Sequence, residues 1–209
     1  MSDGSKFCAK CGAAVSQTGF AYSSGQGTAQ PSESGFVQPT AAAATYLMQY
    51  VTGKGVHVLK DKTVSDESGN VLFTIHRKSN WHMDYDILDS EGEPKGSFSI
   101  KAVGPHHTTE VRDSSGVTTS YIRRKLVTVG APKWWIEDSQ NQKTADVNGQ
   151  FATTEYKVVS NQGETLAWVN RDFSSFSNFS HSACVIHLAD ERFDNLLLFA
   201  LCTAVENVR

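Results

Sequence analysis

The N-terminal segment carries the clearest metal-binding pattern of the chain. Cys8 and Cys11 stand in the order Cys-Ala-Lys-Cys-Gly, and Gly12 lets backbone N–H groups turn toward the two thiolates. This spacing is typical of half a zinc site, since structural zinc takes four ligands. No second cysteine pair follows, and the next histidine is His57. Three interpretations stay open: zinc completed by a second chain or a partner, no metal in the isolated chain, and redox use.

A second candidate site is the one basic stretch. Residues 121–136 contain no acid, and they hold four cations beside two adjacent tryptophans: Arg123, Arg124, Lys125 and Lys133, with Trp134 and Trp135. Cations next to amphipathic aromatic rings suit an anionic phospholipid or phosphoinositide headgroup. The alternative is a solvated strand end beside tryptophans of the core. Strand alternation would put Arg123 and Lys125 on one face and Arg124 on the other, with Ile122.

Three weaker groups of residues remain. They are the basic run His76-Arg77-Lys78, the pair His106-His107 in a loop with Gly and Pro, and the acids Asp190, Glu191 and Asp194 before an apolar segment. We expect the histidines to be solvated loop residues. The acids lack the alternating spacing and turn glycine of a calcium loop, so we expect them to stabilise a helix N-terminus.

No spacing assembles catalytic machinery. The seven histidines form no His-Glu-x-x-His pattern, and neither Gly-x-Ser-x-Gly nor a phosphate-cradling glycine loop occurs. The 209 residues, 39% of them hydrophobic, carry 19 basic and 22 acidic side chains, so no long-range attraction to nucleic acid is expected. We therefore expect a globular, non-enzymatic protein that does not bind nucleic acid.

Cysteine usage and hydropathy indicate the compartment. Cys184 and Cys202 are isolated in apolar segments and are expected in the core, so the four cysteines form no disulfide framework. No apolar run approaches the roughly 18 to 20 residues of a membrane helix, and residues 1–10 lack the order of a signal peptide. These features favour the cytoplasm, with any membrane contact peripheral.

Five turn-like sequences recur along the chain at a nearly constant period. Their centres are spaced by 23, 24, 25 and 22 residues: Gly69, Gly92, Gly116, Asn141 and Gly163. Each centre tolerates positive φ and follows Asp, Ser or Asn, which is the chemistry of a tight hairpin turn. Five hairpins follow, and apolar residues alternate around them, as in Phe98/Ile100 and Leu166/Trp168.

These hairpins predict the fold. With an opening segment at 46–59 and a late strand at 183–188, they give about twelve antiparallel strands, which a closed barrel or two packed sheets would accommodate. Residues 194–208 predict a helix that is apolar on every side over 196–202. The fold class expected is a mostly β protein: an antiparallel closed barrel of about twelve strands around a central hydrophobic C-terminal helix.

Composition divides the chain into three parts. Residues 1–15 hold the zinc-ribbon-like segment around Cys8 and Cys11, here called the knuckle. Residues 16–45 are rich in Gly, Ser, Gln, Thr and Pro with a single charge at Glu33, which is typical of a flexible linker. Residues 46–209 form the barrel domain.

The order of these motifs resembles a known family. Asp-x-x-Gly hairpins, Asp146–Gly149 leading to Glu155–Val158, Leu166–Val169, and Asp194 opening the apolar helix are similar to the LURP-one-related branch of the tubby C-terminal-like superfamily. Phospholipid scramblases are more distantly similar, and the knuckle resembles half a zinc ribbon. The resemblance implies a twelve-stranded barrel around a helix. Tubby-type members bind phosphoinositides through basic residues, scramblase-type members act on lipids with calcium, and LURP-one-type members have no agreed activity.

Residues and resemblance together favour a non-enzymatic binding or scaffold module. It would recognise an anionic lipid headgroup or a protein partner at a membrane surface, with the knuckle as a tether or a homodimer contact. The alternatives are a scramblase-like lipid-active protein and a stress or signalling adaptor without lipid contact.

Overall fold

Five tight turns set the strand pattern in the computed structural model. Gly69, Gly92, Gly116 and Gly163 have φ of +83° to +86°, and Asn141 has φ of +61°. Each turn is held by the side chain that begins it. The Asp113 carboxylate accepts hydrogen bonds from the backbone N–H groups of Ser115 and Val117 at 2.9 and 3.0 Å, and Asp89 and Asp138 do the same in their turns. The five predicted hairpins are confirmed.

The structure describes residues 42–50, 61–79, 81–103, 106–125, 132–150, 155–170 and 184–207. All of them belong to the compact unit Gln38–Arg209. The predicted knuckle 1–15 and nearly all of the predicted linker 16–45 lie outside the described residues.

Twelve strands and one helix are described. In chain order they are β1 (Ala44–Tyr50), β2 (Lys62–Ser65), β3 (Val71–Arg77), β4 (Asp84–Asp89), β5 (Pro94–Val103), β6 (His106–Asp113), β7 (Thr118–Lys125), β8 (Lys133–Asp138), β9 (Lys143–Gln150), β10 (Glu155–Ser160), β11 (Thr165–Asn170), β12 (Cys184–Leu188) and α1 (Asn195–Asn207). The first strand begins two residues before the domain start predicted at residue 46. The pair His106-His107, expected in a loop, instead opens β6.

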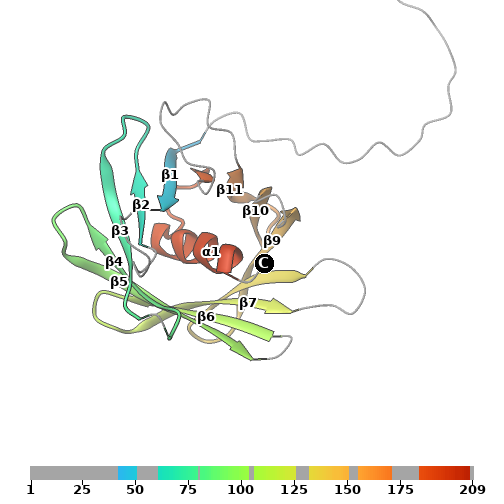
Figure 1. Ribbon diagram of the computed structural model, residues 1–209. Helices are drawn as coiled ribbons and strands as arrows, with labels where there is room; N and C mark the ends of the chain where they lie inside the picture. The colour runs from blue at the N-terminus through green and yellow to red at the C-terminus, as the bar shows by residue number, and fades with distance from the viewer. Residues whose placement is uncertain are drawn as a thin grey trace, which may run out of the picture. The chain divides into compact units, whose positions relative to one another are not determined.

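Every strand pairs antiparallel with its neighbours in the chain. The first strand, β1, also pairs with the last, β12, where Leu47 of β1 lies opposite Val185 of β12. The sheet therefore closes on itself and leaves no free edge. Figure 1 shows the ring of strands around α1. The predicted fold class, a closed twelve-stranded antiparallel barrel with a C-terminal helix inside, is confirmed.

The barrel has two different ends. Because the strands are antiparallel, the five tight turns all lie at one end, which we call the turn end. At the other end, here called the loop end, the odd-numbered strands finish and the even-numbered strands begin. The helix begins at the turn end and finishes at the loop end, where Glu206 contacts Lys62.

The middle of the helix has no polar face to turn toward solvent, so the helix is buried inside the barrel. Residues 197–205 are all buried. Phe199 packs edge-on against Tyr46 of β1 at 5.6 Å and against Phe73 of β3 at 5.4 Å between ring centres. Asp194 caps the first turn, since its carboxylate accepts the Leu196 N–H at 2.8 Å. No helix in the described part of the chain is long and apolar enough to cross a membrane.

The two predicted core cysteines are buried, Cys184 on β12 and Cys202 on α1, at 0% and 1% exposure. In β11 the alternation of apolar residues in the sequence did not single out the core face. Ala167 and Val169 join the core cluster, whereas Trp168 points to the other face and stacks on His187 of β12 at 4.7 Å. The alternation misled because β11 is apolar on both faces.

Gly149 allows β9 and β10 to approach closely. It has φ of +153°, and a Cβ at this position would overlap the Glu155 carbonyl oxygen and the Tyr156 backbone. Gly149→Ala should therefore lower the free energy of unfolding by about 2 to 3 kcal/mol, from strain and steric overlap together. Gly163→Ala is the matched control, because Gly163 has φ of +86° with open space around it. Urea denaturation should show the smaller loss in the control, and equal losses would contradict the close approach.

Candidate functional site

The predicted basic stretch divides between the two faces of the barrel wall. Strands β7 and β8 pair so that Arg123 lies opposite Trp135, Arg124 opposite Trp134, and Lys125 opposite Lys133. Arg123, Lys125 and Lys133 lie on the outer face. Arg124 lies on the inner face with Ile122, as the alternation predicted.

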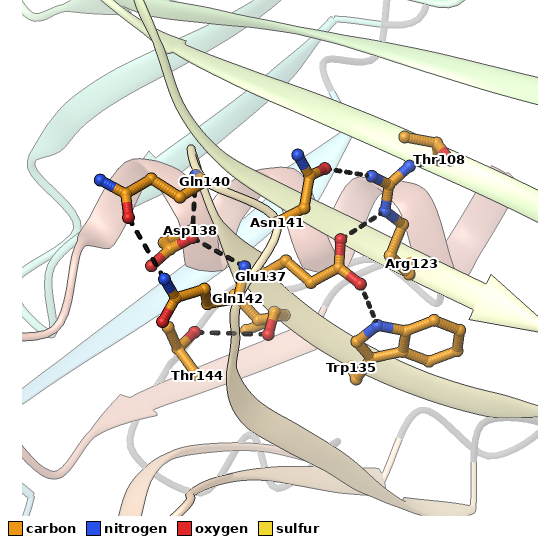
Figure 2. A network of polar contacts seen from close by, with 10 residues as sticks. Thr108, Arg123, Trp135, Glu137, Asp138, Gln140, Asn141, Gln142 and Thr144 are labelled. Atoms are coloured by element: carbon orange, nitrogen blue, oxygen red, sulfur yellow. Dashed lines mark hydrogen bonds and ion pairs between the residues drawn. The ribbon is translucent and has the colours of Figure 1, made fainter.

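Arg123 is held by a polar network on the outer face (Figure 2). Its Nε donates to Glu137 Oε2 at 2.8 Å, and its two terminal nitrogens donate to Thr108 and Asn141, also at 2.8 Å. The Trp135 indole N–H donates to the other Glu137 oxygen at 2.7 Å. The Arg123 charge is therefore neutralised within the wall, and this side chain is a structural brace between β6, β7, β8 and a turn.

Lys125 and Lys133 form the exposed remainder of the stretch. They lie directly opposite each other where β7 ends and β8 begins, at the loop end. Both side chains are exposed, and neither forms an ion pair with a described residue. Like charges directly opposite each other on neighbouring strands destabilise a sheet. This lysine pair therefore costs stability and produces a local positive potential.

A hollow lies beside this lysine pair. It has a volume of about 570 Å³, which is within the usual range of ligand sites. Its walls come from the β8 and β9 strands, with Lys133, Trp135, Asn148 and Gly149 among them. Lys143 also lines it but is paired with Asp146 at 2.7 Å. Lys133 is thus the lining cation that no described carboxylate neutralises.

The loop end also carries an exposed aromatic residue that the sequence analysis missed. Trp81 lies between β3 and β4 and is 92% exposed. A tryptophan between polar Ser79, Asn80 and His82 in a short connection was the available signal. The nearby basic run is engaged in contacts: His76 meets Asp61 at 3.0 Å and Lys78 meets Asp86 at 3.1 Å.

The acids before the helix lie at the turn end, away from this site. Asp190 accepts two N–H groups of the Arg192 guanidinium, at 2.9 and 2.6 Å, which lowers the Asp190 pKa to about 2. Asp194 caps α1, as expected for a helix N-terminus. No cluster of three potential metal ligands occurs among the residues that the structure describes. Zinc at Cys8 and Cys11, which lie outside them, stays a prediction.

Comparisons with known proteins identify the fold. An X-ray structure of a protein from Arabidopsis thaliana (AT5G01750), a LURP-one-related protein, matches with a TM-score of 0.53 and 15% sequence identity, over 80% of this chain and 93% of that chain. The match shows that this chain shares the fold of that protein. No protein-family model matches the chain, and no curated protein sequence is significantly similar to it.

Proposed function

We propose that this barrel is a non-enzymatic binding module that rests its loop end on an anionic lipid surface. The observation that carries the proposal is the exposed pair Lys125 and Lys133. These two like charges lie directly opposite each other, and neither has an acidic partner among the described residues. The hollow beside Lys133 offers room for a headgroup. Trp81 at the same end has the amphipathic ring that favours the membrane interface.

Binding of this kind should be weak and short-ranged. The chain carries 19 basic and 22 acidic side chains, so its overall field does not attract an anionic surface. Each lysine near such a surface contributes about 1 kcal/mol, so the pair supplies about 2 kcal/mol. Insertion of the Trp81 ring adds to this. The association should be reversible and sensitive to salt.

Flotation on vesicles tests the proposal. Wild-type protein should float with phosphatidylcholine vesicles that contain about one third phosphatidylserine, and much less with phosphatidylcholine alone. The double variant Lys125→Gln/Lys133→Gln should lose most of the bound fraction, and Trp81→Ser should reduce it. Raising the salt to about 0.5 M shortens the Debye length to about 4 Å and should release the wild type.

The matched control removes the same number of charges at the other end. Lys95→Gln/Arg192→Gln changes two exposed cations of the turn end, each already paired with an aspartate, and should float like wild type. If wild type floats equally with neutral and anionic vesicles, or the lysine variant matches the control, the lipid proposal is wrong. A protein partner at this end would then be the function to pursue.

A further inference from the structure

The inner face of the barrel carries a second basic pair, which the proposed function does not use. Arg124 of β7 lies directly opposite His107 of β6. Alternate residues of a strand share a face, and the neighbours two positions away are buried: Ile122 beside Arg124 is 1% exposed, and Thr109 beside His107 is 2% exposed. The two side chains therefore face the barrel interior near the loop end.

Neither side chain has a counter-charge within the described part of the barrel. The Arg124 guanidinium lies 5.6 Å from the centre of the Trp134 ring. Its Nε and the Nδ1 of His107 are closed to solvent and have no hydrogen-bond partner among described residues. Burial lowers the pKa of Arg124, while burial and then the Arg124 charge lower the pKa of His107.

Another cation of the barrel interior, Lys62, shows how a buried charge is usually accommodated. Lys62 is 2% exposed, and its ammonium donates to Glu206 at 2.6 Å and to Thr203 at 3.2 Å. A buried charge needs such partners because desolvation is costly. Arginine stays protonated in proteins, so Arg124 cannot avoid this cost by losing its proton. An anion from outside the chain would supply the missing partner.

We propose that Arg124 and His107 bind a phosphate group inside the loop end of the barrel. A guanidinium presents parallel N–H donors that take two oxygens of an oxyanion. A carboxylate has only those two oxygens. A tetrahedral phosphate keeps further oxygens for a third donor, and the His107 ring on the neighbouring strand is placed to provide it.

The ligand reaches this pair from the loop end. Arg124 is half-buried, and Nε is the one nitrogen of its guanidinium that is closed to solvent without a partner among the described residues. The phosphate comes either from a soluble compound or from a lipid headgroup that carries a phosphomonoester. The chemistry of recognition is the same in both cases, and the two sources are separated by experiment.

Isothermal titration with inorganic phosphate, with acetate as the carboxylate comparison, tests the site on the full chain. Wild type should bind phosphate saturably at one site and bind acetate more weakly. Arg124→Gln should weaken phosphate binding about tenfold or more, the usual effect of losing charge-assisted hydrogen bonds. His107→Asn should weaken it less. Lys101→Gln changes an exposed lysine of β5 that is already paired with Glu110, and this control should bind phosphate like wild type.

Thermal melting separates a binding role from a structural one. Phosphate should raise the melting temperature of wild type and leave Arg124→Gln unchanged. Without phosphate, Arg124→Gln should be about as stable as wild type, because it removes a half-buried charge that forms no ion pair with a described residue. Phosphate binding equal in wild type and Arg124→Gln, or no saturable phosphate binding by wild type, would overturn the proposal.

Vesicles identify the source of the phosphate. Flotation on phosphatidic acid that depends on Arg124 would assign the site to a lipid headgroup, whereas phosphate binding in solution without such flotation would assign it to a soluble compound. Flotation on phosphatidylserine depends on Lys125 and Lys133 and should not respond to Arg124→Gln. Failure of the interior site and failure of the lipid-surface proposal are therefore distinguishable.

Discussion

Glu206→Gln should lower the free energy of unfolding by about 3 to 5 kcal/mol, the usual cost of removing one partner from a buried ion pair. Glu206 near the end of α1 meets Lys62 of β2 at 2.6 Å, and their side chains are 13% and 2% exposed. The variant leaves the Lys62 ammonium buried without its carboxylate. Chemical denaturation of the two proteins gives the difference directly.

Two further variants distinguish a buried charge from a general packing effect. Lys62→Met/Glu206→Leu removes both charges with similar volume and should recover most of the stability. Lys143→Gln breaks the exposed pair with Asp146, whose partners are 47% and 49% exposed, and should cost no more than about 1 kcal/mol. A Glu206→Gln loss as small as that of Lys143→Gln would show that the pair contributes little.

Leu198→Ala should lower the free energy of unfolding by about 2 to 5 kcal/mol and the melting temperature by several degrees. Leu198 is fully buried in the core that α1 shares with the strands. Truncation removes apolar contacts and leaves a cavity that the closed barrel wall cannot easily fill. Thermal melting followed by circular dichroism measures the shift.

An exposed valine provides the control for this truncation. Val117 is 61% exposed next to a tight turn, and Val117→Ala should change the melting temperature little. A Leu198→Ala melting curve that overlays the wild-type curve would contradict a structural role for the helix inside the barrel.

The sequence predicted the barrel because its turns have local chemistry. Asp113 with Gly116 specifies a turn within four residues, and the same arrangement recurs at a near-constant spacing. The helix was also predictable from local sequence, because Asp194 marks its start and the apolar residues that follow can be buried only inside the barrel of an otherwise β protein. The face of β11 was not predictable, because both of its faces are apolar and the stacking of Trp168 on His187 joins residues of different strands.

The candidate site depended on pairing between strands, which the sequence does not contain. The alternation of faces along a strand correctly predicted that Arg124 lies on the inner face of the barrel, because this rule needs only the sequence of one strand. The capture of Arg123 by Glu137 required the register of β7 against β8, fourteen residues apart in the chain. The same register brings Lys125 opposite Lys133. His107 was expected in a loop because the Gly-Pro before the histidines suggested one, yet β6 begins immediately afterwards.

The position of the helix inside the barrel has a consequence for synthesis. All twelve strands leave the ribosome before α1, so the wall is made before the segment that fills it. Closure must wait further, because Thr45 of β1 and His187 of β12, which contact each other, are 142 residues apart. Until the helix emerges, inner-face residues such as Ile75 and Ile122 have nothing to pack against. The nascent chain thus exposes apolar strand residues until the helix emerges, and exposed strands of this kind are prone to aggregate.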